Sequence, residues 1–285
     1  MKLTSLVSVV LASSAVAAPS NQPADSSPLP PSVNKIPTSY ESAVLGRRIL
    51  AKTPIGTLAT VFPDDASPVP TNEQRPSDVG GVPLALMDYI ADCSPSSPGD
   101  PTILALNIET HFRNVAAGSN ISLSIRWAPP HPPSKRIKQT SSSRPQSVLS
   151  FLGLSSSDGE VDEEDYDPLP YSAANLPRFS LIGYISPIPD SDDRSDPSSV
   201  GAKLASCFTA AHPDAKYWLP GNRIHEAHFV RLVVTHVYWI GGFGDRAYIG
   251  WIPVEEWRNV TREEWEGVRL PGEKKGWKEW TVDDL

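Results

Sequence analysis

The chain has 285 residues, with 25 Lys and Arg against 33 Asp and Glu, so its formal net charge is −8. An acidic chain without a basic tail is not typical of nucleic-acid binders, because phosphate contacts need clustered Lys and Arg. No apolar run reaches the roughly 18 residues that a membrane span needs. Two cysteines are too few for a disulfide scaffold or a cysteine-only zinc site.

Proline divides the chain into regions. There are 30 prolines among 285 residues, about twice the average usage, and they concentrate in residues 18–39 and 128–177. We expect a signal peptide over 1–17, a flexible leader over 18–39 and one domain over 40–285. A disordered insertion rich in Ser, Pro and acidic residues is expected to interrupt this domain at 128–177.

The N-terminus predicts secretion. Met1-Lys2 is followed by an uncharged apolar stretch and by the small residues Ala15-Val16-Ala17, the pattern of a cleaved signal peptide. We therefore expect the protein in the extracellular space or in the lumen of the secretory pathway. Asn120 and Asn259 begin glycosylation sequons. Cys93 and Cys207 either form a disulfide in that oxidising compartment or remain two separate buried thiols.

Apolar spacing predicts the elements of the first half. A helix is expected over 40–52, where Tyr40, Val44 and Ile49 recur at helical spacing. Strands are expected over 57–62, 82–87, 102–108 and 121–127, with a short helix over about 109–117.

The second half continues with strands at 178–188, 227–240 and 247–252 and a helix over 200–211. The strand 227–240 is apolar on both parities, which is typical of a central strand covered on both faces. Thr261 and Glu264 form a capping-box pattern that opens a terminal helix. The element order does not alternate as in a doubly wound sheet, so it predicts an α+β antiparallel barrel.

Two apparent motifs do not support a site. Residues 242–247 match G-x-G-x-x-A, but the strand-like sequence that follows cannot supply the helix of a dinucleotide site, so a tight hairpin is expected. His225 and His228 are three residues apart at the start of a strand, where they point to opposite faces, so no metal site is expected. No Ser-His-Asp spacing or paired-carboxylate pattern names a catalytic group, and the sequence does not decide whether the chain is an enzyme.

The sequence His111-Phe112-Arg113-Asn114 lies where a strand leads into a helix. Such junctions bind anions through helix N-termini. The other interpretation is a cluster that caps the helix. Both remain open from the sequence.

An ordered series of segments resembles known families. The segment 56–60 (GTLAT) and the run from Leu106 to Asn114, leading into Asn120-Ile121-Ser122-Leu123, resemble the first half of split-barrel proteins related to pyridoxamine-phosphate oxidase. His212-Pro213 with Trp218 resembles the "HP…W" segment of the secreted CREG glycoproteins. Residues 229–239 with the following 241–244 (GGFG), and residues 252–257, resemble their penultimate strand and closing segment.

The resemblance implies a homodimeric antiparallel split β-barrel with short peripheral helices. In flavin-binding relatives, FMN lies at the dimer interface and basic residues at the strand-to-helix junction hold its phosphate. The matching positions here are Thr110 and His111, with Arg113 and Asn114 beside them, and the adjacent basic pair is missing. Relatives with His at this junction include haem-utilisation proteins, so the cofactor stays undetermined between FMN, haem and none.

Two functions follow from the resemblance. The first is a secreted CREG-like glycoprotein that binds a ligand, or a protein partner in the extracellular or vacuolar space, without catalysis. The alternative is a flavin- or haem-dependent oxidoreductase that uses the corner formed by His111, Arg113 and Asn114.

Overall fold

The fold is seen in a computed structural model that describes residues 35–64, 74–94, 96–134 and 172–279. The predicted signal peptide, nearly all of the leader and the acidic part of the predicted insertion lie outside these residues. The described residues belong to one compact unit, Lys35–Leu285.

The strands and helices follow the predicted order. The strands are β1 (Ile55–Val61), β2 (Pro83–Ala91), β3 (Thr102–Leu106), β4 (Ile121–Arg126), β5 (Arg178–Pro187), β6 (Ala227–Ile240) and β7 (Ile249–Ile252). The helices are α1 (Ser39–Lys52), α2 (Thr110–Ala116), α4 (Val200–Ala211), α5 (Val254–Asn259) and α6 (Arg262–Gly267), with the 3-10 turns η1 (Ala173–Asn175) and η2 (Pro213–Tyr217).

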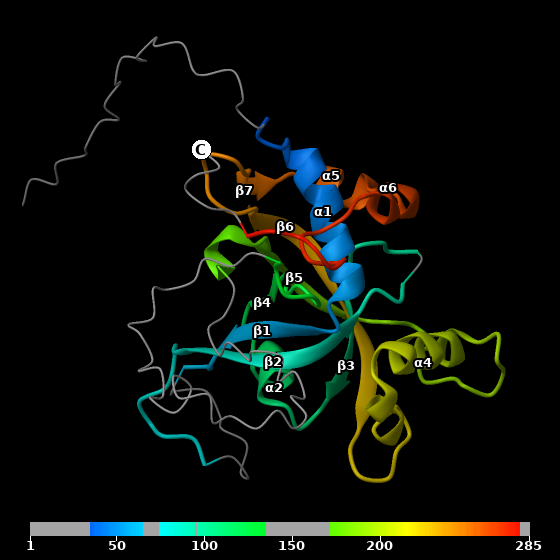
Figure 1. Cartoon of the computed structure of the whole chain (residues 1–285). Coiled ribbons are helices and arrows are strands. Elements are labelled where there is room, and N and C mark those ends of the chain that lie inside the picture. Colours follow the sequence, from blue (N-terminus) through cyan, green and yellow to red (C-terminus); the bar gives the residue numbers. More distant parts are fainter. Residues whose placement is uncertain (1–34, 65–73, 95, 135–171, 280–285) are drawn as a thin grey trace, which may run out of the picture. The chain divides into compact units, whose positions relative to one another are not determined.

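The seven strands form one antiparallel sheet that closes on itself. The order is β3-β2-β1-β4-β5-β6-β7, and an additional pairing of β3 with β6 closes a barrel of the first six, leaving β7 as an extension. The predicted α+β antiparallel split barrel is therefore confirmed. Figure 1 shows α1 beside α5 and α6 at one end of the barrel, while α4 lies apart from them.

The core of the barrel follows from strand alternation. Leu58 of β1 is in register with Leu123 of β4, Leu123 with Leu181 of β5, and Leu181 with Val237 of β6. All four side chains are fully buried. Because side chains alternate between the two faces of a strand, this inward row determines which residues of these four strands point into the barrel.

Gly183 bends strand β5. The register between β5 and β6 shifts between Ile182 and Gly183. A Cβ atom at Gly183 would lie 1.9 Å from the carbonyl oxygen of Val233, so only glycine permits this close approach.

Three local predictions need correction. Strand β2 continues to Ala91, past the expected end at 87, because β1 pairs with it as far as Tyr89 and β3 pairs with Ile90 and Ala91. Residues 254–259 form α5, which was not predicted. The β6–β7 connection is longer than a tight hairpin: residues 241–248 form it, and the Gly241 amide donates to the Tyr248 carbonyl oxygen across its base.

The described ends of the predicted insertion pack on the C-terminal segment. The Trp127 indole donates to the Pro271 carbonyl at 2.6 Å, and the Trp277 indole donates to the His131 carbonyl at 2.7 Å. Chain on the β4 side of the insertion is therefore anchored to the C-terminal segment.

A disulfide and a buried histidine join α4 and η2 to the barrel. Cys93, just after β2, and Cys207 in α4 are disulfide-bonded, with Cα atoms 5.8 Å apart. His212 is 4% exposed, and its Nε2 lies 3.0 Å from the Ile90 carbonyl oxygen. The His212 ring stacks on Tyr89 at 4.4 Å, which gives the His212-Pro213 motif a structural role.

Helix α1 buries a charged side chain. Arg47 is 2% exposed and donates to the carbonyls of Trp257 at 3.2 Å and Val260 at 3.4 Å. Its Nη2 lies 3.4 Å from the Asp92 carboxylate. Burial lowers the pKa of Arg47 and raises the pKa of Asp92, which disfavours both charged forms. The opposite charge of each partner offsets this effect. The guanidinium thereby links α1 to α5 and to the end of β2.

Removing this guanidinium is expected to destabilise the barrel strongly. Arg47→Met leaves the Asp92 carboxylate and two carbonyls without their donor, which costs roughly 3–5 kcal/mol of unfolding free energy, measured by urea denaturation. The control is Arg262→Ala, whose ion pair with Glu266 is largely exposed and should change little. Equal losses in the two variants would contradict this role for Arg47.

Candidate functional site

The junction between β3 and α2 holds the residues that the sequence singled out. Glu109 is the N-cap of α2, and no side chain caps this helix end. His111 and Asn114 are 4% and 3% exposed, while Thr110 and Arg113 are half-buried. Residues three apart share a helix face, so His111 and Asn114 form one pair and Thr110 and Arg113 another.

His111 and Asn114 meet on a threonine of β1. Asn114 Nδ2 donates to Thr60 Oγ1 at 3.1 Å, and His111 Nδ1 lies 3.0 Å from the same oxygen. Burial lowers the pKa of His111, which favours the neutral ring. The two side chains thus fix α2 to the barrel wall through Thr60.

Two carboxyl groups complete the junction and were not predicted. Burial and the nearby Asp88 raise the pKa of Glu109 to about 7, and one oxygen of Glu109 is buried without a hydrogen-bond partner. Burial raises the pKa of Asp88 in β2 to about 6. A lone Asp within an apolar strand and a Glu directly before a helix were the only sequence signals for them.

These residues do not fit a flavin phosphate. A phosphate dianion is held best by several cationic donors, whereas the junction offers, beside Arg113, a neutral imidazole, an amide and two carboxyl groups. When ionised, these two carboxyl groups would repel the phosphate.

A haem ligand at His111 is no better supported. His111 Nε2 is buried without a partner, as a ligating atom could be. However, His111 is not among the residues that line the cleft on the other side of α2, to which Phe112 and Val115 contribute.

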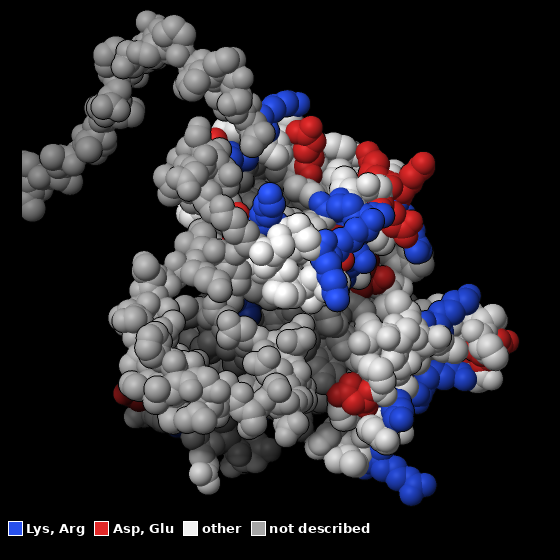
Figure 2. Space-filling view, in the orientation of Figure 1, with Lys and Arg blue, Asp and Glu red and all other residues white. Residues whose placement is uncertain are grey.

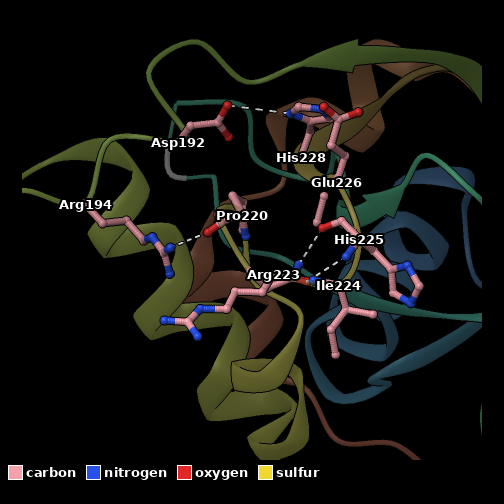
Figure 3. A pocket seen from close by; sticks show the side chains of 11 residues that line it. Asp192, Arg194, Pro220, Arg223, Ile224, His225, Glu226 and His228 are labelled. Carbon is pink, nitrogen blue, oxygen red and sulfur yellow. Dashed lines mark hydrogen bonds and ion pairs between the residues drawn. The ribbon is translucent and has the colours of Figure 1, made fainter.

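Two clefts lie beside the junction. The first, about 680 Å³, lies between α2, the ends of β3 and β5, and the start of β6, with Phe112 and Val115 in its wall. The second, about 480 Å³, is shown in Figure 3, where the facing Asp192 and His228 stand on one side and Arg194 and Arg223 on the other. Asp192 and His228 line both clefts.

The other sequence candidates fall outside this junction. Asn120, just before β4, and Asn259, the last residue of α5, are both exposed. Residues 249–252 after the glycine-rich turn form β7, so this turn opens no helix. Over the described part of the chain, no group of three or more His, Cys, Asp or Glu side chains is arranged to hold a metal ion.

The hydroxyl of Thr60 is expected to matter more than its methyl group. Thr60→Val leaves His111 and Asn114 without their shared partner and should cost about 1–3 kcal/mol of unfolding free energy. Thr60→Ser keeps the hydroxyl and should lose less. Chemical denaturation of both variants distinguishes them, and a larger loss in the serine variant would exclude the hydrogen-bond role.

The Glu109 carboxyl is expected to make stability depend on pH. Its folded pKa of about 7 lies above the ordinary value of 4.5 for a Glu carboxyl, so the folded state holds the proton more tightly and stability falls as the pH rises between these values. Glu109→Gln should therefore be more stable than the parent at pH 8 and similar to it at pH 4.

Urea denaturation across this pH range measures the effect, with the exposed Glu263→Gln as control. The Glu109 interpretation fails if the glutamine variant follows the pH profile of the parent.

Comparison with known proteins identifies a family match and several similar solved structures. The family model described as "CREG, beta-barrel" matches residues 37–259, and no curated protein sequence matches the chain. Similar solved structures include a haem-binding protein from Mycobacterium smegmatis, at 19% identity and TM-score 0.42, which covers 78% of this chain and 60% of its own length.

Two further structures are similar. An FAD-binding protein from Mesorhizobium loti has 12% identity and TM-score 0.31, covering 67% of this chain and 87% of its own. An F420 reductase has 14% identity and TM-score 0.35, covering 71% and 98%. The family model alone spans most of the described barrel, from just before α1 to the end of α5. The chain therefore belongs to the CREG β-barrel family.

Proposed function

We propose that this chain is a secreted CREG-family glycoprotein that acts by binding a ligand or a protein partner, without oxidoreductase chemistry. The observation that carries the proposal is the charge of the β3–α2 junction. Asp88 and Glu109 stand where a bound flavin would need cations, and His111 and Asn114 are used to hold α2 on β1.

Three features support secretion. Residues 1–17 have the sequence of a signal peptide. The Cys93–Cys207 disulfide fits an oxidising compartment. Both sequon asparagines, Asn120 and Asn259, are exposed and so are accessible to glycosylation.

A homodimer is part of the proposal. Leu86 and Met87 are adjacent in β2, so they point to opposite faces, and they are 54% and 56% exposed. Ile108, after β3, is 56% exposed. A strand that leaves large apolar side chains open on both faces supports burial against another chain.

Over the described residues, no helix is both long enough and apolar enough to span a bilayer.

The alternative is a haem- or flavin-dependent oxidoreductase centred on His111. One observation favours it, the buried Nε2 atom of His111 that has no partner in the described structure. Ligation through this atom would require the wall around His111 to open.

The absorption spectrum of protein purified from a secretory host tests the proposal. We expect colourless protein and no new visible band on titration with FMN or haem, because the junction lacks an adjacent pair of cations for a flavin phosphate and His111 is buried against Thr60. The alternative instead predicts a band that His111→Ala weakens. Yellow protein carrying stoichiometric FMN would exclude the binding-only function.

A further inference from the structure

The cleft of about 680 Å³ next to α2 has the size of a small-molecule site. Its apolar wall comes from α2, from the end of β5 and from β6. The side chains that form this wall are Phe112, Val115, Ile185, Ile188 and Val230. Such a wall suits the aliphatic or aromatic body of a ligand.

The charge of the cleft has one sign. Asp190, Asp192 and Asp193, in the turn after β5, lie along one edge, and no Lys or Arg is among the described lining residues. Asp193 accepts bonds from the Ser195 amide and hydroxyl, which lower its pKa. Asp192 faces His228 at 3.6 Å. Asp190 has φ 56°, an uncommon conformation for a residue other than glycine.

Ser191 adds a polar group at the base of this edge. It lines the cleft and is only 6% exposed. Within the described structure its hydroxyl has no hydrogen-bond partner, although its amide donates to the Ile188 carbonyl. This oxygen is not among the fully buried unpartnered side-chain atoms, so it is open to the cleft and can accept a hydrogen bond from a ligand.

Two arginines line the neighbouring cleft. Figure 3 shows Arg194 and Arg223 directed away from the Asp192–His228 pair, and Arg194 donates to the Pro220 carbonyl. The two clefts meet at Asp192 and His228. The apolar cleft therefore keeps its acidic edge.

We propose that this cleft binds a small organic amine, with the ammonium group at the Asp190–Asp193 edge and an aromatic or aliphatic body against Phe112 and Val115. The inference rests on the proposed function and names the class of ligand. An ammonium group donates hydrogen bonds to carboxylates and to the Ser191 hydroxyl, whereas an anion of the same shape meets like charge.

Calorimetric titration with tryptamine and with indole-3-acetate tests the sign of the ligand charge, because the two share the indole ring. We expect tryptamine to bind and indole-3-acetate to bind roughly tenfold more weakly, because the edge carries exposed carboxylates. Raising the salt concentration should weaken tryptamine binding. Equal binding of both compounds, or no binding of tryptamine, overturns the proposal.

Variants locate the site. Asp190→Asn with Asp192→Asn should weaken tryptamine severalfold, while Asp245→Asn, in the distant β6–β7 turn, should not. Ala116→Trp, at an exposed position in the cleft wall, should block tryptamine while keeping the parent unfolding midpoint. Unchanged tryptamine affinity in the double variant or in Ala116→Trp overturns the site.

The two proposals can fail separately. Flavin-free protein that ignores tryptamine overturns the amine site and leaves the binding function standing. Protein that carries stoichiometric FMN overturns the proposed function, whatever it does with tryptamine.

Discussion

Closure of the barrel through strand β6 is the constraint on which the rest of the structure depends. This strand pairs with β5 along nearly its whole length, with β3 from Ala227 to Arg231 and with β7 from Val237 to Ile240. Both faces of β6 are buried near its start, where Phe229 and Val230 belong to two different core clusters. His236 and Tyr238 near its end are exposed, so the prediction that the strand is covered on both faces is correct only for its first part. The bend at Gly183 lets β5 follow β6, because any side chain there would strike Val233.

The position of the candidate site follows from this closure. Pairing of β3 with β6 fixes the end of β3, so α2 begins beside β1 and β2 and brings His111 to Thr60. The same pairing places α2 opposite the turn after β5, which creates the cleft.

The charged side chains around α1 and α6 differ in distribution from those at the cleft. On the face in Figure 2, basic and acidic side chains are interspersed around α1 and α6, while the cleft has acidic side chains along one edge.

Local pattern predicted most of the fold. Apolar spacing predicted all seven strands, and the Thr261–Glu264 capping box correctly placed the start of α6. Predictions were least accurate where contacts with distant segments of the chain determine where a strand or a connection ends. The end of β2 depends on its pairing with β3, and the β6–β7 connection depends on packing around Gly241, whose Cβ position is crowded by Trp239. The site was half predicted: His111 and Asn114 were named, but Thr60 and Asp88 join them only through the barrel.

The acidic junction supports the proposal that the chain acts without a flavin. A scaffold can keep its strand pairing when surface residues at one junction change, because the inward rows such as Leu58–Leu123–Leu181 specify the pairing. In this chain His111 and Asn114 face the barrel wall and contribute to its packing. Burial raises the pKa of Asp88 to about 6 and the pKa of Glu109 to about 7, so both carboxyl groups lose their protons as the pH rises through neutrality. A protonated carboxyl neither attracts an anion nor repels an apolar surface strongly. Repulsion of a phosphate by the junction is therefore strongest above neutral pH and weakens as the pH falls and the two carboxyl groups become protonated.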